Sequence, residues 1–256
     1  MNYFTLSLAL IFVFIPLILS KTLNLGLEKD TVIATIRSII QLLVVGYILK
    51  MVFDTEHLFF IFIMIALMIT AATQNTRKKG VSIKGITWKL VITFVFIELL
   101  TQLILIGFHI IPPTAQYMIP ISGMVIGNSM VLAILFLNRF DAEIASRKEH
   151  IELILSLGGT PKQAIQKQLV ASIKASTIPT IESQKTIGLV QLPGMMSGQI
   201  IAGADPVQAV QFQLLILFLL LTTAVTTSVL LGFLAYPTLF NDRMQFLEDR
   251  FIKREK

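Results

Sequence analysis

The chain contains 256 residues, of which 55% are hydrophobic and only 14% are charged, and its mean hydropathy is +0.80. Charged residues make up about a quarter of a soluble globular domain, so this composition excludes an ordinary soluble enzyme domain, a disordered chain and a small secreted scaffold. The formal net charge is +6, and the lack of cysteine excludes disulfides, thiolate zinc sites and cysteine nucleophiles.

Long runs with few charges predict seven membrane-spanning helices, and therefore an all-α polytopic fold in a single permease domain, residues 1–256. A helix needs about 20 apolar residues to cross the hydrocarbon core of a bilayer. In chain order the runs are residues 1–20, 32–49, 58–76, 90–138, 186–204 and 206–241. The run 90–138 is long enough for two helices, which Pro112 and Pro113 separate. The glycine-rich run 186–204 is the weakest of these segments.

The basic residues predict how the chain is oriented in the membrane. Of the 21 lysines and arginines, all but Lys50 and Arg37 fall in the first, third and fifth predicted loops or in the C-terminal tail. Because loops rich in Lys and Arg favour the cytoplasmic side, we expect an external N-terminus and a cytoplasmic C-terminus in a multi-pass protein of the cell membrane. This asymmetry is ordinary for such proteins, so the basic loops do not indicate nucleic-acid binding.

The fifth predicted loop, residues 139–185, is long enough to contain helices of its own. Apolar residues recur at helical spacing over 141–157, and Gly158 and Gly159 are expected to end that helix. Thr160 is a typical N-cap and Pro161 a typical first residue of a second amphipathic helix, residues 161–172, and Pro179 is expected to end the segment after it. Two interpretations remain open: a connector that lies on the membrane surface, or an element on which a soluble partner docks.

Several segments resemble one family of transport proteins. The segment 152–164, ELILSLGGTPKQA, resembles the coupling segment of ATP-binding-cassette permeases, which forms a short helix in a groove of the ATPase subunit. The segments 191–203 (QLPGMMSGQIIAG), 127–130 (GNSM) and 137–139 (LNR) resemble the FetB-type iron-export permease family, which includes the plant aluminium-sensitivity transporters. The resemblance extends over the whole chain, with one departure at Gly159, where alanine is commoner and the change should be tolerated at a helix corner.

The resemblance implies a permease subunit that works as a homodimer with two cytoplasmic ATPase subunits and exports iron or a related metal. ATP and Mg²⁺ would then bind to the ATPase, and this chain would bind no cofactor. The sequence agrees, since it contains no Gly-x-x-x-x-Gly-Lys-Ser/Thr phosphate-binding loop, and we expect no enzymatic activity of its own. The resemblance assigns contact with the ATPase to Glu149, Glu152, Leu157, Gly158, Gly159, Thr160, Pro161 and Ala164.

Polar and ionisable residues within the predicted spans are candidates for the substrate pathway, because such residues are costly at membrane depth. The candidates are Glu98, Gln102, Asn128, Gln191, Met195 and Arg37. Glu98 is equally compatible with a packing contact, whereas the sequence favours a side chain that reaches the interface for Arg37 and ordinary packing for Met195. Small residues that favour close helix packing are Gly123, Gly127, Gly194, Gly198 and Ala202. The three histidines form no metal-binding pattern, so a metal ligand set stays unknown.

A second functional hypothesis is a stand-alone secondary carrier or channel in which Glu98 couples transport to a proton or cation. One convincing buried carboxylate, and no evident internal repeat, count against it. An intramembrane serine hydrolase is disfavoured because no histidine lies at membrane depth to serve as its base.

Overall fold

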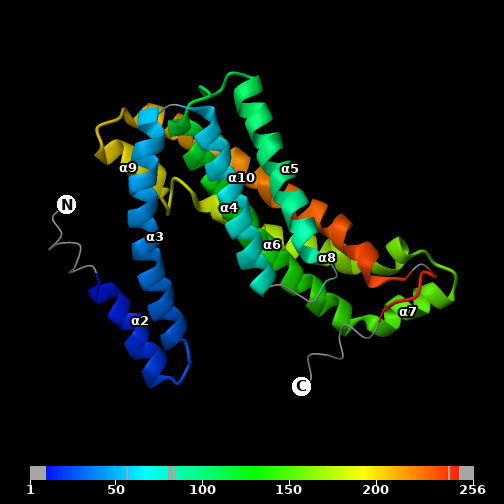
Figure 1. The fold of residues 1–256 in the computed structure, drawn as a ribbon. Coiled ribbons are helices and arrows are strands. Elements are labelled where there is room, and N and C mark those ends of the chain that lie inside the picture. Colours follow the sequence, from blue (N-terminus) through cyan, green and yellow to red (C-terminus); the bar gives the residue numbers. More distant parts are fainter. Residues whose placement is uncertain (1–9, 56, 80–82, 84, 242, 248–256) are drawn as a thin grey trace. The chain divides into compact units, whose positions relative to one another are not determined.

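The computed structural model describes residues 10–55, 57–79, 83, 85–241 and 243–247, and all its named elements are helices (Figure 1). This confirms the predicted all-α class. The helices are α2 (Ile11–Thr22), α3 (Glu28–Thr55), α4 (Leu58–Lys79), α5 (Ile86–Gly107), α6 (Ala115–Ser146), α7 (Lys148–Ser156), α8 (Pro161–Thr186), α9 (Gly194–Ile201), α10 (Pro206–Ala235) and the 3₁₀ turn η1 (Tyr236–Leu239).

Contacts among the described residues divide the chain into two compact units, Met1–His57 and Leu58–Lys256. The first unit contains α2 and α3, joined by a turn in which Ser20 Oγ donates a hydrogen bond of 2.7 Å to Glu28 Oε1. The predicted first span lies partly outside the described residues, since residues 1–9 are not described. The helix α3 contains the predicted second span and buries none of its most hydrophobic 18-residue window inside the structure. The single permease domain stays a prediction.

The second unit is built around α6, which packs against α4, α5, α8 and α10. Its core is mostly aliphatic, and its largest fully buried side chains are Phe94, Phe136 and Phe140. The rings of Phe136 and Phe140 stack with centroids 5.2 Å apart. The predicted break at the two prolines is confirmed, because α5 ends at Gly107 and α6 begins at Ala115.

The relative directions of neighbouring helices follow from pairs of contacts at different points along their lengths. A Cβ on Gly123 would lie 3.8 Å from Met68 Cε, and Asn75 lies beside Met130, so α4 and α6 run parallel. Asn128 bonds to Thr223 and Phe136 lies beside Gly232, so α6 and α10 also run parallel.

The helix boundaries predicted within residues 139–185 are wrong. Residues 141–146 are the last part of α6, a break at Arg147 comes next, and α7 begins at Lys148. The second helix does not end near residue 172: α8 continues through Pro179 to Thr186. It packs against α6 and α10, so it is not a connector lying on a surface.

The predicted sixth span, residues 186–204, is also wrong. The only helix within it that the structure describes is α9, which has 8 residues and a length of about 12 Å, too short to cross a bilayer. Instead, α8 returns along α10 in the opposite direction: Leu169 lies beside Gly232, Ser176 Oγ lies 2.8 Å from Ser228 Oγ, and Gln184 Nε2 lies 2.8 Å from Leu217 O.

Five described helices are long and apolar enough to span a membrane. The helix α8 is not among them, because its buried face is rich in hydroxyl groups and its exposed face carries lysines.

Candidate functional site

The corner between α7 and α8 has the geometry that its sequence predicts. Thr160 caps α8: Gln163 N donates to Thr160 Oγ1 at 3.3 Å, and Thr160 N donates to Gln163 Oε1 at 2.8 Å. Gly158 has a φ of +85°, which favours glycine. A Cβ on Gly159 would lie 2.5 Å from Ile154 Cγ2 and 2.8 Å from Ile154 O, so alanine at this position would force the corner to shift.

The predicted coupling residues divide into an exposed group and an inward group. Leu157 is 79% exposed, although a side chain of its kind is normally buried, and Glu149, Glu152, Gly158 and Thr160 are also exposed. In the other group Ala164 is fully buried, while Gly159 and Pro161 are half-buried. A soluble partner can therefore reach the first group directly, and Ala164 supports the corner from inside.

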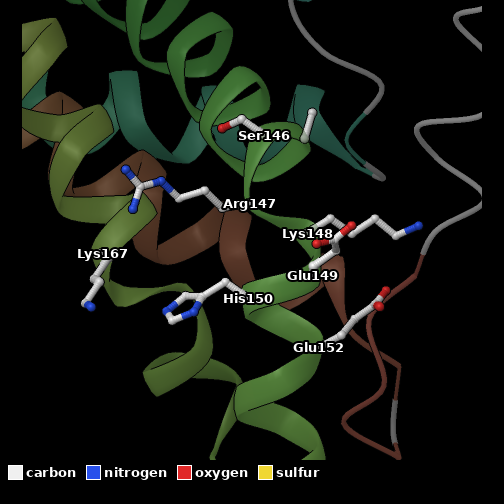
Figure 2. A pocket seen from close by; sticks show the side chains of 8 residues that line it. Ser146, Arg147, Lys148, Glu149, His150, Glu152 and Lys167 are labelled. Atoms are coloured by element: carbon white, nitrogen blue, oxygen red, sulfur yellow. The ribbon is translucent and has the colours of Figure 1, made fainter.

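Two pockets flank α7. The first, of about 620 Å³, is lined mainly by charged side chains (Figure 2). In Figure 2, Arg147, His150 and Lys167 lie on one side of α7, and Glu149 and Glu152 on the other. The residues that line it are Ala145, Ser146, Arg147, Lys148, Glu149, His150, Glu152 and Lys167.

The second pocket, of about 530 Å³, separates the corner from the C-terminal segment 243–246. Asn241 shapes that segment, because Asn241 Oδ1 accepts from the backbone N–H groups of Arg243 and Gln245. The ring of Phe246 lies against that of Phe240. Sequence reasoning assigned no role to this segment; an asparagine just after a long apolar run is the signal for a turn.

Glu98 lies in a small polar cluster between α5 and α6. Its side chain is only 4% exposed. Ser122 Oγ donates to Glu98 Oε1 at 2.5 Å, and Gln102 Nε2 donates to the same oxygen and to Ser122 Oγ, each at 2.9 Å. Glu98 Oε2 and Gln102 Oε1 make no hydrogen bond within the described chain. The structure therefore brings Glu98 and Gln102 together, and it adds Ser122, which lies too far along the sequence for spacing to reveal.

A cavity of about 330 Å³ with a mixed lining of apolar and polar side chains lies at the C-terminal end of α8 and is called the amide cavity below. The segment after α8 turns at Gly188, whose N–H donates to Gln191 O at 2.9 Å. Non-helical backbone at membrane depth is tolerated where it lines a cavity, and Ile187, Gln191 and Pro193 do so here. The cavity brings four side-chain amides together, from Asn128, Gln184, Gln191 and Gln213, and none of its lining residues is charged.

The predicted pathway residues therefore do not form one site. Asn128 and Gln191 line the cavity, and Asn128 Nδ2 donates to Thr223 Oγ1 at 3.2 Å. Met195 packs against an apolar cluster that includes Ile97 and Ile216, which favours the packing interpretation. Arg37 is exposed and belongs to the other unit.

The predicted packing glycines also differ in their surroundings. Gly123 faces Met68, but a Cβ on Gly127, Gly194 or Gly198 would meet nothing within 4 Å, and Ala202 is exposed. The tightest interhelical glycine contact is at Gly232, which sequence reasoning missed: a Cβ there would lie 2.6 Å from Leu169 Cδ1 and 3.1 Å from Phe136 Cζ. The described residues contain no cluster of three His, Cys, Asp or Glu side chains that could hold a metal ion.

Comparison with known proteins places the chain in a family. The family model described as "Uncharacterised protein family (UPF0014)" matches residues 3–240. The chain is 55% identical over 249 residues to "UPF0014 membrane protein YjkA" of Bacillus subtilis, and the aligned residues make up 97% of this chain and 100% of the relative. It is 37% identical over 253 residues to "Probable iron export permease protein FetB" of Escherichia coli, covering 98% and 96% of the two chains. It is 30% identical over 237 residues to "Protein ALUMINUM SENSITIVE 3" of Arabidopsis thaliana, covering 93% and 87%.

No solved structure shows significant similarity to the chain. The family match and the long apolar helices agree with each other. The chain is a multi-pass membrane protein and belongs to the UPF0014 family.

Proposed function

We propose that this protein is the permease subunit of a transporter in which two copies pair with two separate ATP-binding-cassette ATPase subunits and export iron or a related metal. The similarity to a relative named as a probable iron export permease, over 98% of this chain, supports both the transport function and the cargo. In this proposal ATP and Mg²⁺ bind to the ATPase, this chain binds no cofactor, and nucleic acid takes no part.

The observation that carries the proposal is that one helix joins the exposed corner to the amide cavity. The helix α8 begins at Pro161, next to the exposed Leu157, and contributes Thr180, Ser183 and Gln184 to the cavity wall. Its 26 residues span about 39 Å. A displacement imposed at the corner therefore reaches the cavity through a continuous helix.

The same contacts define how that displacement changes the cavity. The rest of the cavity wall comes from α6, α10 and the segment that precedes α9. When the ATPases close on ATP, α8 moves relative to α6 and α10, and the amides that face the cavity separate or approach. This is alternating access with the moving wall on α8.

Copurification and transport measurements test the proposal. The chain is expressed with and without a candidate ATP-binding-cassette ATPase subunit from the same organism, and purified through a tag on the chain. We expect the ATPase to copurify, and iron to move across proteoliposome membranes only when the ATPase and ATP are present. Iron movement of equal rate without the ATPase would overturn the proposal.

A second candidate, a carrier or channel that works alone, is favoured by one observation. Glu98 is buried with one carboxylate oxygen free of any hydrogen bond within the described chain, an arrangement suited to taking up a proton or cation. The two candidates differ in the ATPase-free proteoliposomes, because only the carrier acidifies or alkalises them as cargo moves.

A further inference from the structure

A charged pair lies on the exposed face of α8, close to its C-terminal end. Lys185 Nζ lies 2.6 Å from Glu182 Oε1, and their side chains are 62% and 59% exposed. Between them Gln184 turns inward and donates to Leu217 O at 2.8 Å. The pair therefore faces away from α10, whereas Gln184, which lies between its two members in the sequence, is hydrogen-bonded to α10.

The depth of this pair follows from Leu217. That residue lies eleven positions after Pro206, the first residue of α10, which places it about 16 Å along the helix. The hydrocarbon core of a bilayer is about 30 Å thick, and residues 206–241 contain no charged residue. Glu182 and Lys185 therefore lie opposite a point about a third of the way along the 30 residues of α10, within an uncharged membrane span.

Lipid is an unsuitable neighbour for this face. Charged side chains at membrane depth face a protein or a water-filled path, because hydrocarbon cannot solvate them. The exposed side of α5 provides a contrast within the same unit. There the large exposed side chains are all apolar, including Leu99 at 64% and Leu103 at 71%, as expected of a surface in contact with lipid.

We propose that a second copy of this chain covers the exposed face of α8. A two-fold axis along the membrane normal brings the two α8 helices together at equal depth, and each contact then occurs twice. Glu182 then meets Lys185 of the partner subunit, and the reverse contact follows by symmetry. Ile178 and Ile181, which are 50% and 39% exposed, lie on the same face at helical spacing and supply the apolar part of the contact.

The position of this surface matters for transport. Thr180, Ser183 and Gln184 of α8 line the amide cavity, so the cavity lies beside the contact between the two copies. This inference rests on the proposed function only in assuming that two copies work together. Its tests use the chain without an ATPase, so they can fail while ATPase binding succeeds.

Cross-linking tests the contact directly. The chain has no native cysteine, so single variants Ile178→Cys and Ile181→Cys can be oxidised in native membranes without a background. We expect both to form a covalent dimer, and the lipid-facing control Leu103→Cys to remain a monomer. The proposal is overturned if the α8 variants remain monomeric, or if Leu103→Cys cross-links as readily.

A charge experiment separates contacts between copies from the pair within one chain. Lys185→Glu leaves two acids on this face, and Glu182→Lys leaves two bases, so neither variant keeps the pair within a chain. When the two variants carry different tags and are coexpressed, we expect mixed dimers to exceed both like-charged dimers at least several-fold. Mixing in statistical proportions would refute the predicted contact, and wild-type chains with the two tags provide the reference.

Discussion

Gly232→Ala is predicted to destabilise the protein, because side chains of both α6 and α8 pack tightly against α10 at Gly232. The added Cβ would lie 2.6 Å from Leu169 Cδ1 and 3.1 Å from Phe136 Cζ. Alanine is favoured over glycine within a helix by about 0.5–1 kcal/mol, while overpacking of a tight interior costs about 1–3 kcal/mol. We therefore expect a net loss of about 1–2 kcal/mol in the free energy of unfolding.

The assay is unfolding in mixed micelles by titration with sodium dodecyl sulfate, followed by circular dichroism at 222 nm. The matched control is Gly127→Ala on α6, whose Cβ would meet nothing within 4 Å, so only the gain in helix propensity should appear. In the double variant with Leu169→Ala, the freed space should make the two losses less than additive. Equal stability of the two glycine variants would refute the packing of α8 against α10.

Three further predictions address the corner, the cluster and the cavity. Leu157→Glu should reduce copurification of the ATPase at least tenfold, because it charges the 79% exposed side chain at the corner; Val207→Glu, which changes a 64% exposed side chain at the first turn of α10, should have no effect. Glu98→Gln should lower iron transport about tenfold or more while expression and dimer formation stay at wild-type levels, and wild-type transport would remove Glu98 from the pathway. Asn128→Leu should lower transport by removing one of the four amides of the cavity, whereas Asn75→Leu, near the end of α4, should leave transport within about twofold of wild type; equal effects would indicate a packing role.

The corner and the long apolar helices were predictable because their signals are local. Five of the seven predicted apolar spans form helices long enough to span a bilayer, because a helix satisfies its backbone hydrogen bonds within its own segment. The Thr-Pro cap of α8 depends only on residues within four positions, and the structure contains the expected bonds between Thr160 and Gln163. The same locality accounts for the break between α5 and α6 at the two prolines.

The path of α8 was not predictable from hydropathy. After Leu169 its buried residues are Ser172, Ser176 and Thr177 rather than large apolar side chains, and such residues pack well only against a close partner helix. That partner is α10, with Ser228 and Gly232 at the contact. A helix with polar residues on both faces does not resemble a membrane span until its neighbours are known.

The sequence by itself therefore determined the all-α class, five of the seven predicted apolar spans and the capped corner, since each depends on residues that are close along the chain. Only the tertiary structure decided that α8 packs against both α6 and α10, that Ser122 donates a hydrogen bond to Glu98 from 24 residues away, and that Asn128 and Gln191 share a cavity. These arrangements join residues distant in sequence, and the packing of several helices at once selects them.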